Sequence, residues 1–149
     1  MLSKAKILED LFRQLNSRIE ELRAAQILLR ESRDNESKSS AGDKYETGRA
    51  MAQIELDKLQ QQLQNQMELQ AELLKIKPEV ETEKVGFGSL VETSNGIYFI
   101  SIGMGKVMLD DTSFYAISLA SPLGQALKGA QTGDTLTFNR DNIQIISVI

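Results

Sequence analysis

The chain has 149 residues, a formal net charge of -4, and neither cysteine nor histidine. Disulfides, Cys/His zinc sites, Ser-His-Asp triads and Cys-His pairs are therefore excluded, and any acid-base or metal chemistry must use carboxylates. The mild charge does not indicate a basic nucleic-acid-binding protein. This length suits one ordinary domain, or a small domain joined to an extended element.

The sequence predicts a cytoplasmic protein without a membrane partner. Glu9, Asp10 and Arg13 interrupt the first residues before an apolar stretch of useful length forms, so we expect no secretory signal. No later stretch approaches the roughly 20 apolar residues that cross a bilayer.

Residues 1–77 have the pattern of two long helices. Apolar residues recur at spacings of three and four in two stripes: Leu8, Leu11, Leu15, Ile19, Leu22 and Leu29, then Leu56, Leu59, Leu63, Met67 and Leu74. Narrow stripes on polar helices, separated by the polar stretch 34–43, predict an antiparallel coiled-coil hairpin about 45 Å long. The same stripes also fit a dimeric coiled coil or part of a helical bundle; we expect a monomer.

Pro78 ends the helical pattern, and residues 78–84 are interpreted as a linker. From residue 85 to 149, β-branched runs and glycine turns predict a small α+β domain with a mostly antiparallel sheet and one short helix. Asn95-Gly96 indicates one hairpin, and residues 139–142 a second. Ser121 is suited to cap the helix that Pro122 begins. Four phenylalanines are expected in the core: Phe87, Phe99, Phe114 and Phe138.

Two segments of this second half carry a family resemblance. "VGFGSLVE" and "ISLASPLGQALKGAQTGDTLTF" resemble the C-terminal domain of the bacterial Gre transcript-cleavage factors. The most specific part is Ser-Pro-x-x-x-Ala-Leu-x-Gly followed by Gly-Asp. Gre factors join an N-terminal antiparallel coiled coil to an FKBP-like C-terminal domain, so the resemblance extends over nearly the whole chain and implies an FKBP-like sheet domain.

The segment between the two helices resembles the tip of the Gre coiled coil. The family has Gly-Asp-Leu-Ser-Glu-Asn, and this chain has Gly-Asp-Lys-Tyr-Glu-Thr at residues 42–47. Asp43 and Glu46 match in type and spacing, whereas the Leu, Ser and Asn positions differ and "RDNESKSSA" replaces the basic stretch before the tip. Residues three apart on a helix share a side, with Cβ atoms about 5–6 Å apart.

The resemblance implies an accessory factor for RNA polymerase, not an enzyme in its own right. The coiled coil would enter the secondary channel of the polymerase, where Asp43 would be the main ligand of a magnesium ion (Mg2+) held jointly with the polymerase. Glu46 would share the ion and orient or deprotonate the water that attacks near the 3′ end of backtracked nascent RNA. Ser121, Pro122, Leu123 and Gln125 resemble the region that docks on the polymerase.

Other interpretations of these residues stay open. Asp43 and Glu46 also fit a capping box at the start of the second helix, and the segment after Ser121 also fits helix capping and packing. The whole chain also fits a regulator that occupies the polymerase channel without promoting cleavage, or a helical-hairpin interaction protein with no polymerase partner.

Overall fold

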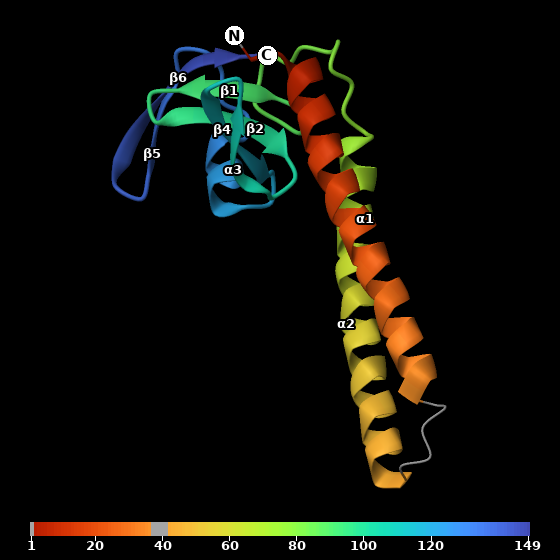
Figure 1. Ribbon diagram of the computed structural model, residues 1–149. Helices are drawn as coiled ribbons and strands as arrows, with labels where there is room; N and C mark the ends of the chain where they lie inside the picture. Colours follow the sequence, from red (N-terminus) through yellow and green to blue (C-terminus); the bar gives the residue numbers. More distant parts are fainter. Residues whose placement is uncertain (1, 37–41) are drawn as a thin grey trace. The chain divides into compact units, whose positions relative to one another are not determined.

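The structure of the chain is a computed structural model that describes residues 2–36 and 42–149, with side chains described for 2–35 and 46–149. Two long helices are followed by six strands, with a short helix between the fourth and fifth strands (Figure 1). The elements are α1 (Lys4–Glu36), α2 (Gly42–Leu73), β1 (Leu90–Thr93), β2 (Gly96–Ser101), β3 (Gly105–Leu109), β4 (Thr112–Ser118), α3 (Pro122–Leu127), β5 (Thr135–Phe138) and β6 (Asp141–Val148). The predicted α+β class is confirmed.

The chain divides into two compact units. The sheet unit consists of Met1–Phe12 and Ala71–Ile149, and the outer arm consists of Arg13–Gln70. The first turns of α1 and the last residues of α2 thus belong to the same unit as the sheet. Lys4 shows this directly, because its Nζ donates a hydrogen bond to the carbonyl oxygen of Val80 at 2.9 Å.

In the outer arm, α1 and α2 lie side by side as an antiparallel hairpin (Figure 1). Side-chain hydrogen bonds between the described residues of the two helices join Asn16 with Gln70, Gln26 with Gln60, and Arg33 with Gln53. The two residue numbers of every pair add up to 86, as a constant antiparallel register requires. The predicted helical hairpin is therefore confirmed.

The seam between the helices follows the predicted stripes only in part. Leu15, Ile19, Leu56 and Leu63 are buried as expected. The prediction was wrong for Met67 and Leu74, which are 41% and 71% exposed. After Leu63 the buried positions continue at Leu73 and Ile76. A stripe with steps of three and four residues can continue along either of two neighbouring rows of a helix. Here it follows the row whose side chains belong to the sheet unit.

The six strands form one sheet in the order β3-β4-β2-β1-β6-β5. Only β2 and β4 pair in parallel; every other pair is antiparallel, as predicted. The β1–β2 hairpin turns at Ser94 and Asn95, with Gly96 at φ 136° as the first residue of β2. The β5–β6 hairpin turns at Asn139 and Arg140, both with positive φ, as two-residue hairpin loops favour.

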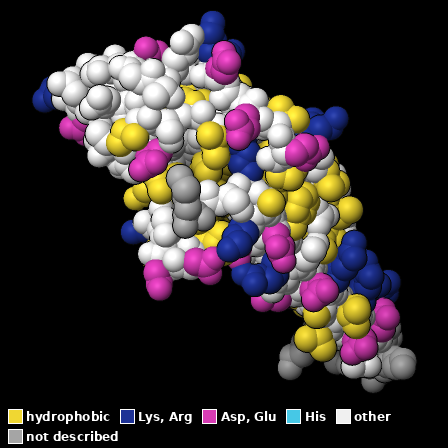
Figure 2. Space-filling view, turned by 90° about the horizontal axis from the view of Figure 1, so that it is seen from above, with side chains coloured by type: hydrophobic (Ala, Val, Ile, Leu, Met, Phe, Trp, Pro, Cys, Tyr) yellow, Lys and Arg dark blue, Asp and Glu magenta, His cyan; other side chains and the backbone are white. Residues whose placement is uncertain are grey.

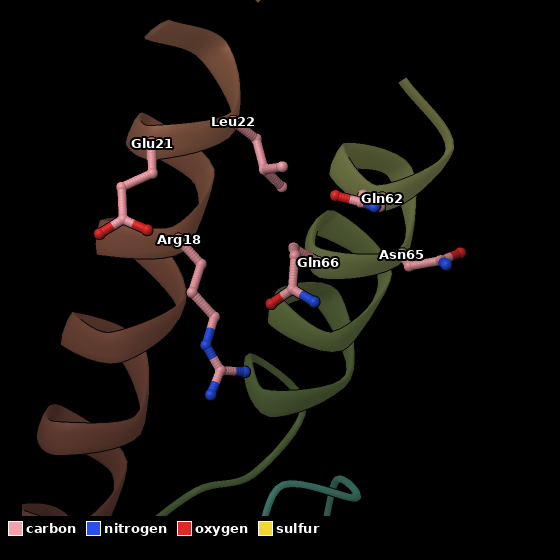
Figure 3. A pocket seen from close by; sticks show the side chains of 6 residues that line it. All are labelled: Arg18, Glu21, Leu22, Gln62, Asn65 and Gln66. Carbon is pink, nitrogen blue, oxygen red and sulfur yellow. The ribbon is translucent and has the colours of Figure 1, made fainter. Parts of the chain in front are cut away.

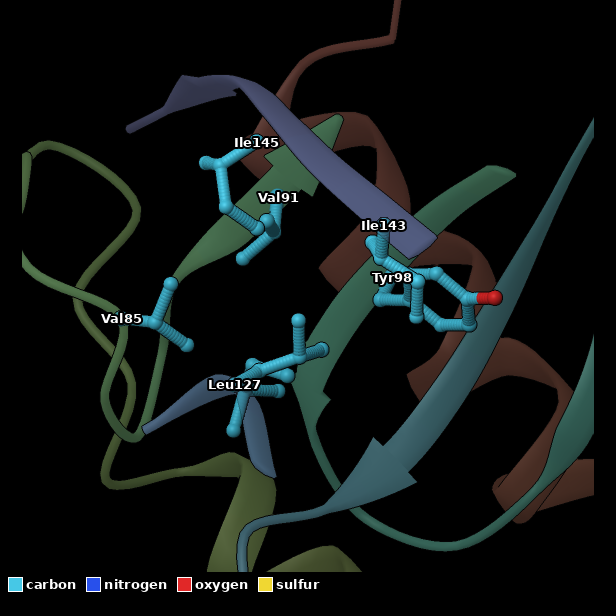
Figure 4. Packing of buried hydrophobic residues seen from close by; sticks show 7 residues of the cluster. Val85, Val91, Tyr98, Leu127, Ile143 and Ile145 are labelled. Carbon is cyan, nitrogen blue, oxygen red and sulfur yellow. The ribbon is translucent and has the colours of Figure 1, made fainter. Parts of the chain in front are cut away.

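The core of the sheet unit lies between one face of the sheet and α3 (Figure 4). Its buried members are Val85, Val91, Tyr98, Ile100, Leu127, Ile143 and Ile145. Phe99 and Phe114 are also completely buried, but strand alternation and the β2–β4 register place them on the opposite face. Phe138 packs on the edge of the core, whereas Phe87 is 37% exposed, so the prediction for Phe87 was wrong.

Within the part of the chain that the structure describes, no helix combines the length and the apolar character needed to span a membrane.

Candidate functional site

The two acidic residues singled out in the sequence both belong to the first turns of α2, which begins at Gly42. The side chain of Glu46 is exposed. The side chain of Asp43 lies outside the described residues, so the predicted closeness of the two carboxylates stays a prediction.

The register of the hairpin shows what surrounds this segment of α2. Glu36, the last residue of α1, has Ala50 as its register partner, since the numbers of paired residues add up to 86. Residues 42–49 of α2 therefore extend past the end of α1, as the lower end of the helix pair in Figure 1 also shows. Glu46 consequently stands on a stretch of helix that no residue of α1 faces.

The capping interpretation can be compared with the helix start. An N-cap residue precedes the first helical residue, and Asp43 is the second residue of α2. Because helix ends are defined to within one or two residues, both the capping role and the ligand role of Asp43 stay predictions.

The described residues offer no metal site of their own. Among them, no group of three or more His, Cys, Asp or Glu side chains is arranged to hold an ion. Two carboxylates three residues apart do match the hard oxygen donors that magnesium prefers, and magnesium is commonly bound by one or two carboxylates together with substrate phosphate and water. The donor set at the tip therefore fits a magnesium ion whose other ligands come from a partner.

A groove that sequence reasoning missed lies near the tip. It has a volume of about 180 Å³ and is lined by Gln26, Arg30, Arg33, Gln53, Leu56, Asp57 and Gln60. Arg33 donates from Nη1 to Oε1 of Gln53 at 3.0 Å, and Gln53 donates from Nε2 to Oδ1 of Asp57 at 3.0 Å. The signal that could have found this contact is the hairpin register, which pairs residue 33 with residue 53.

A larger cavity of about 420 Å³ lies midway along the outer arm (Figure 3). It is lined by Arg18, Glu21 and Leu22 from α1 and by Gln62, Asn65 and Gln66 from α2. The side-chain oxygen of Gln66 is buried there and has no hydrogen-bond partner among the described residues. A polar lining of this kind suits water, and it marks a break in the apolar seam.

The segment at the start of α3 has a clear structural role. Ser121 is the N-cap: its Oγ accepts a hydrogen bond from the backbone N–H of Gly124 at 3.1 Å and donates one to the carbonyl oxygen of Ser118 at 2.7 Å. Pro122 is the first helical residue, as predicted. Gly129 follows the helix with φ 82°, the left-handed conformation that favours glycine after a helix.

Leu123 and Gln125 also have structural roles. Leu123 packs against the core of the sheet unit. Gln125 is exposed, and its Nε2 donates a hydrogen bond to the carbonyl oxygen of Leu119 at 2.7 Å. A docking role for these residues stays a prediction; Pro122 and Gln125 are exposed, and Ser121 and Leu123 are partly exposed.

The surface of the outer arm mixes all types of side chain. Figure 2 shows acidic, basic and hydrophobic side chains next to one another on the arm, at the lower right of the view. The exposed large hydrophobic residues there include Ile27, Leu28, Met51 and Ile54, each more than half exposed.

Fold and site together define an α+β protein in which a long helical hairpin precedes a six-stranded mixed sheet. No family model matches the chain, and no curated protein matches it in sequence. Two solved structures are similar to nearly all of it. The crystal structure of GreA factor homolog 1 (Gfh1) of Thermus thermophilus is 22% identical over 95% of this chain and 94% of that chain, with a TM-score of 0.35. A structure described as that of the transcription factor Gfh1 is 25% identical over 99% and 95%, with a TM-score of 0.34.

Proposed function

We propose that this chain is a Gre-like transcription elongation factor. It binds RNA polymerase, inserts the end of its helical hairpin into the secondary channel, and stimulates the polymerase's own cleavage of backtracked RNA. The motifs of the tip and of the second half support the proposal. The observation that carries it is the exposure of Glu46 on the part of α2 that extends past α1.

The dimensions of the hairpin suit this task. In the outer arm, residues 13–36 of α1 correspond to about 36 Å and residues 42–70 of α2 to about 44 Å at 1.5 Å per residue. A pair of helices of this length can carry a side chain deep into a partner, whereas the sheet unit stays outside the channel. Ser121, Pro122, Leu123 and Gln125 belong to the surface of the sheet unit that contacts the polymerase at the channel entrance.

The proposed chemistry of the tip uses only carboxylates. Asp43 and Glu46 would hold a magnesium ion together with carboxylates of the polymerase. Beside the ion that the polymerase already holds, this ion would supply charge stabilisation for the attacking and leaving oxygens of phosphodiester hydrolysis. Glu46 orients the attacking water or accepts its proton. The chain is therefore an accessory factor, and alone it holds no magnesium stably, because two carboxylates leave most positions of the ion to other ligands.

The test is magnesium-dependent RNA shortening in a stalled, backtracked elongation complex. Wild type is compared with Asp43→Asn and Glu46→Gln at matched polymerase occupancy. Each substitution is expected to slow cleavage by about 100-fold or more, as the loss of a general base or of an ion ligand does, while polymerase binding is kept. Glu55→Gln, an exposed position further along α2, is the matched control and is expected to cleave as wild type does.

The other outcomes separate the rival functions. If the wild type binds polymerase but shortens no RNA, the chain is a regulator that occupies the channel without promoting cleavage. If it fails to bind core polymerase at low salt, it is a helical-hairpin protein with a different partner.

A further inference from the structure

The outermost of the three cross-helix hydrogen bonds described above joins Arg33 of α1 to Gln53 of α2. It lies close to the end of α1 at Glu36, beyond which α2 continues without a partner helix. Of these three bonds, it is the one nearest to the start of α2.

The side-chain amide of Gln53 is held at both of its ends. Its Oε1 accepts from Nη1 of Arg33 at 3.0 Å, and its Nε2 donates to Oδ1 of Asp57 at 3.0 Å. Turning the amide over would place its N–H groups against a guanidinium and its oxygen against a carboxylate, so only one orientation satisfies both neighbours. These three side chains, which we call the Arg33–Gln53–Asp57 bridge, therefore form a directional link between the two helices.

Glu46 lies on the same face of α2 as this bridge. It precedes Gln53 by seven residues, which is two helical turns, and residues seven apart share a helix face. The register partner of Glu46 would be residue 40, beyond the end of α1 at Glu36. The direction of the Glu46 carboxylate therefore depends on how α2 is rotated about its own axis where the bridge holds it.

The apolar contacts of the seam constrain this rotation less strictly. Leu56 is buried close by, yet dispersion contacts are not directional and tolerate small rotations of one helix against the other. Hydrogen bonds weaken steeply as their angles worsen. A catalytic carboxylate must be held within about 0.5 Å and 10–20° of its productive geometry.

We propose that the Arg33–Gln53–Asp57 bridge positions the tip: it fixes the rotation of α2 and thereby the direction in which Asp43 and Glu46 are presented to a partner's active site. This inference rests on the function proposed above for the tip. Arg33, Gln53 and Asp57 are positioning residues, because they act through α2 and do not touch the RNA or the ion.

The test compares Gln53→Met, which keeps the length of the side chain but makes neither hydrogen bond, with Gln53→Glu, whose carboxylate accepts from Arg33. The matched control is Gln61→Met. Gln61 is exposed on the same helix and donates to Asn65 within α2, not across the hairpin. Two measurements are made on each variant. The first is a titration of RNA cleavage, which gives the rate at saturating factor and the factor concentration at half-saturation. The second is the distribution of distances between a spin label on α1 and one on α2.

For the labels, Glu31→Cys and Thr47→Cys are introduced at exposed positions of α1 and α2, since the chain has no cysteine of its own. Gln53→Met is expected to broaden the distance distribution and to lower the saturating cleavage rate by about 10-fold, with half-saturation unchanged. Gln53→Glu keeps the hydrogen bond from Arg33 but sets a second carboxylate against Asp57, so it is expected to recover the rate only in part. Gln61→Met is expected to behave as wild type does.

An unchanged distance distribution in Gln53→Met overturns the proposal, and so does a broadened distribution with an unchanged cleavage rate. If the wild type itself shortens no RNA, the proposed function fails, and the distance distributions still decide whether the bridge fixes the rotation of α2.

Discussion

Gly124 in α3 lies against the carbonyl oxygen of Ser118, the last residue of β4, with no room for a side chain between them. A Cβ atom on Gly124 would overlap the Ser118 oxygen and would stand 2.8 Å from the carbonyl oxygen of Leu119. Both neighbours are backbone atoms, which cannot swing away as a flexible side chain can.

Gly124→Ala is therefore expected to lower the free energy of unfolding by about 1–3 kcal/mol, because α3 must move away from β4 and disturb the core packing of Leu127. Urea denaturation of the purified chain measures this. Gly86→Ala is the control, since a Cβ at Gly86 meets nothing within 4 Å. Equal stability of the two variants would show that α3 can shift at no cost.

The hydroxyl of Ser121 is expected to stabilise the folded protein. Ser121→Ala removes the N-cap hydrogen bond to Gly124 and the hydrogen bond to Ser118, and we expect it to cost about 1 kcal/mol. Ser121→Thr keeps the hydroxyl and should lose much less. Thermal unfolding of the two variants provides the comparison, and an alanine variant as stable as the threonine variant would contradict the capping role.

Replacing the buried amide of Gln26, between the two helices, is expected to stabilise the protein. Gln26 is 6% exposed and donates to Gln60, which is itself exposed. Gln26→Leu is expected to raise the free energy of unfolding by about 1 kcal/mol, because it buries apolar surface while the freed Gln60 returns to water. Gln64→Leu, at an exposed position of α2, should change stability little. The prediction fails if both variants have the melting temperature of wild type.

The buried ammonium group of Lys4 is expected to make the stability of the protein depend on pH. Burial lowers the pKa of its ammonium group from the ordinary 10.5, against the opposing effect of Glu81. Between the lowered folded-state pKa and 10.5 the unfolded chain binds more protons than the folded chain, so this group makes stability rise with pH through that window. Below the window both states carry the proton, and the full cost of burying the charge is present.

We therefore expect wild type to gain stability relative to Lys4→Met as the pH approaches 10.5. Urea denaturation at neutral pH and just below this value measures the difference. Lys6→Met, at a position with an exposed side chain, is the control for removing a lysine charge from α1. A difference between wild type and Lys4→Met that stays constant with pH would contradict the burial of the charge.

Local signals in the sequence predicted much of the fold. The Ser121-Pro122 pair specified the start of α3 because a hydroxyl cap and a fixed φ suit only a helix start, and the two hairpin turns followed from residues that accept unusual φ values. The helical hairpin followed from periodicity. Periodicity could not decide whether the buried row continues after Leu63 through Met67 or through Gln66. Leu73, on the second of these rows, is buried in the sheet unit, most of whose residues lie far away in the sequence.

Of the candidate site, the sequence pointed to the two acidic residues but not to the contact between Arg33 and Gln53. Asp43 and Glu46 were singled out because residues 42–47 resemble the tip motif of the Gre factors, and their role stays a prediction. The contact of Arg33 with Gln53 depends on the hairpin register, which single residues do not reveal. Phe87 was wrongly expected in the core for a similar reason. Alternation predicts which side chains of a strand share a face, but it does not show where the strand begins, and Phe87 precedes the start of β1 at Leu90.

The division of the sheet unit into two pieces of chain bears on how the protein folds. Met1–Phe12 must join Ala71–Ile149, and the residues between them, 13–70, are in effect one long loop. Closing a flexible loop of that length costs chain entropy. Here the loop is itself a helical hairpin held by nearby contacts, so its formation brings the two pieces together in advance. Formation of the outer arm is accordingly expected to precede docking of the first turns of α1 onto the sheet, and loosening the arm should slow that step.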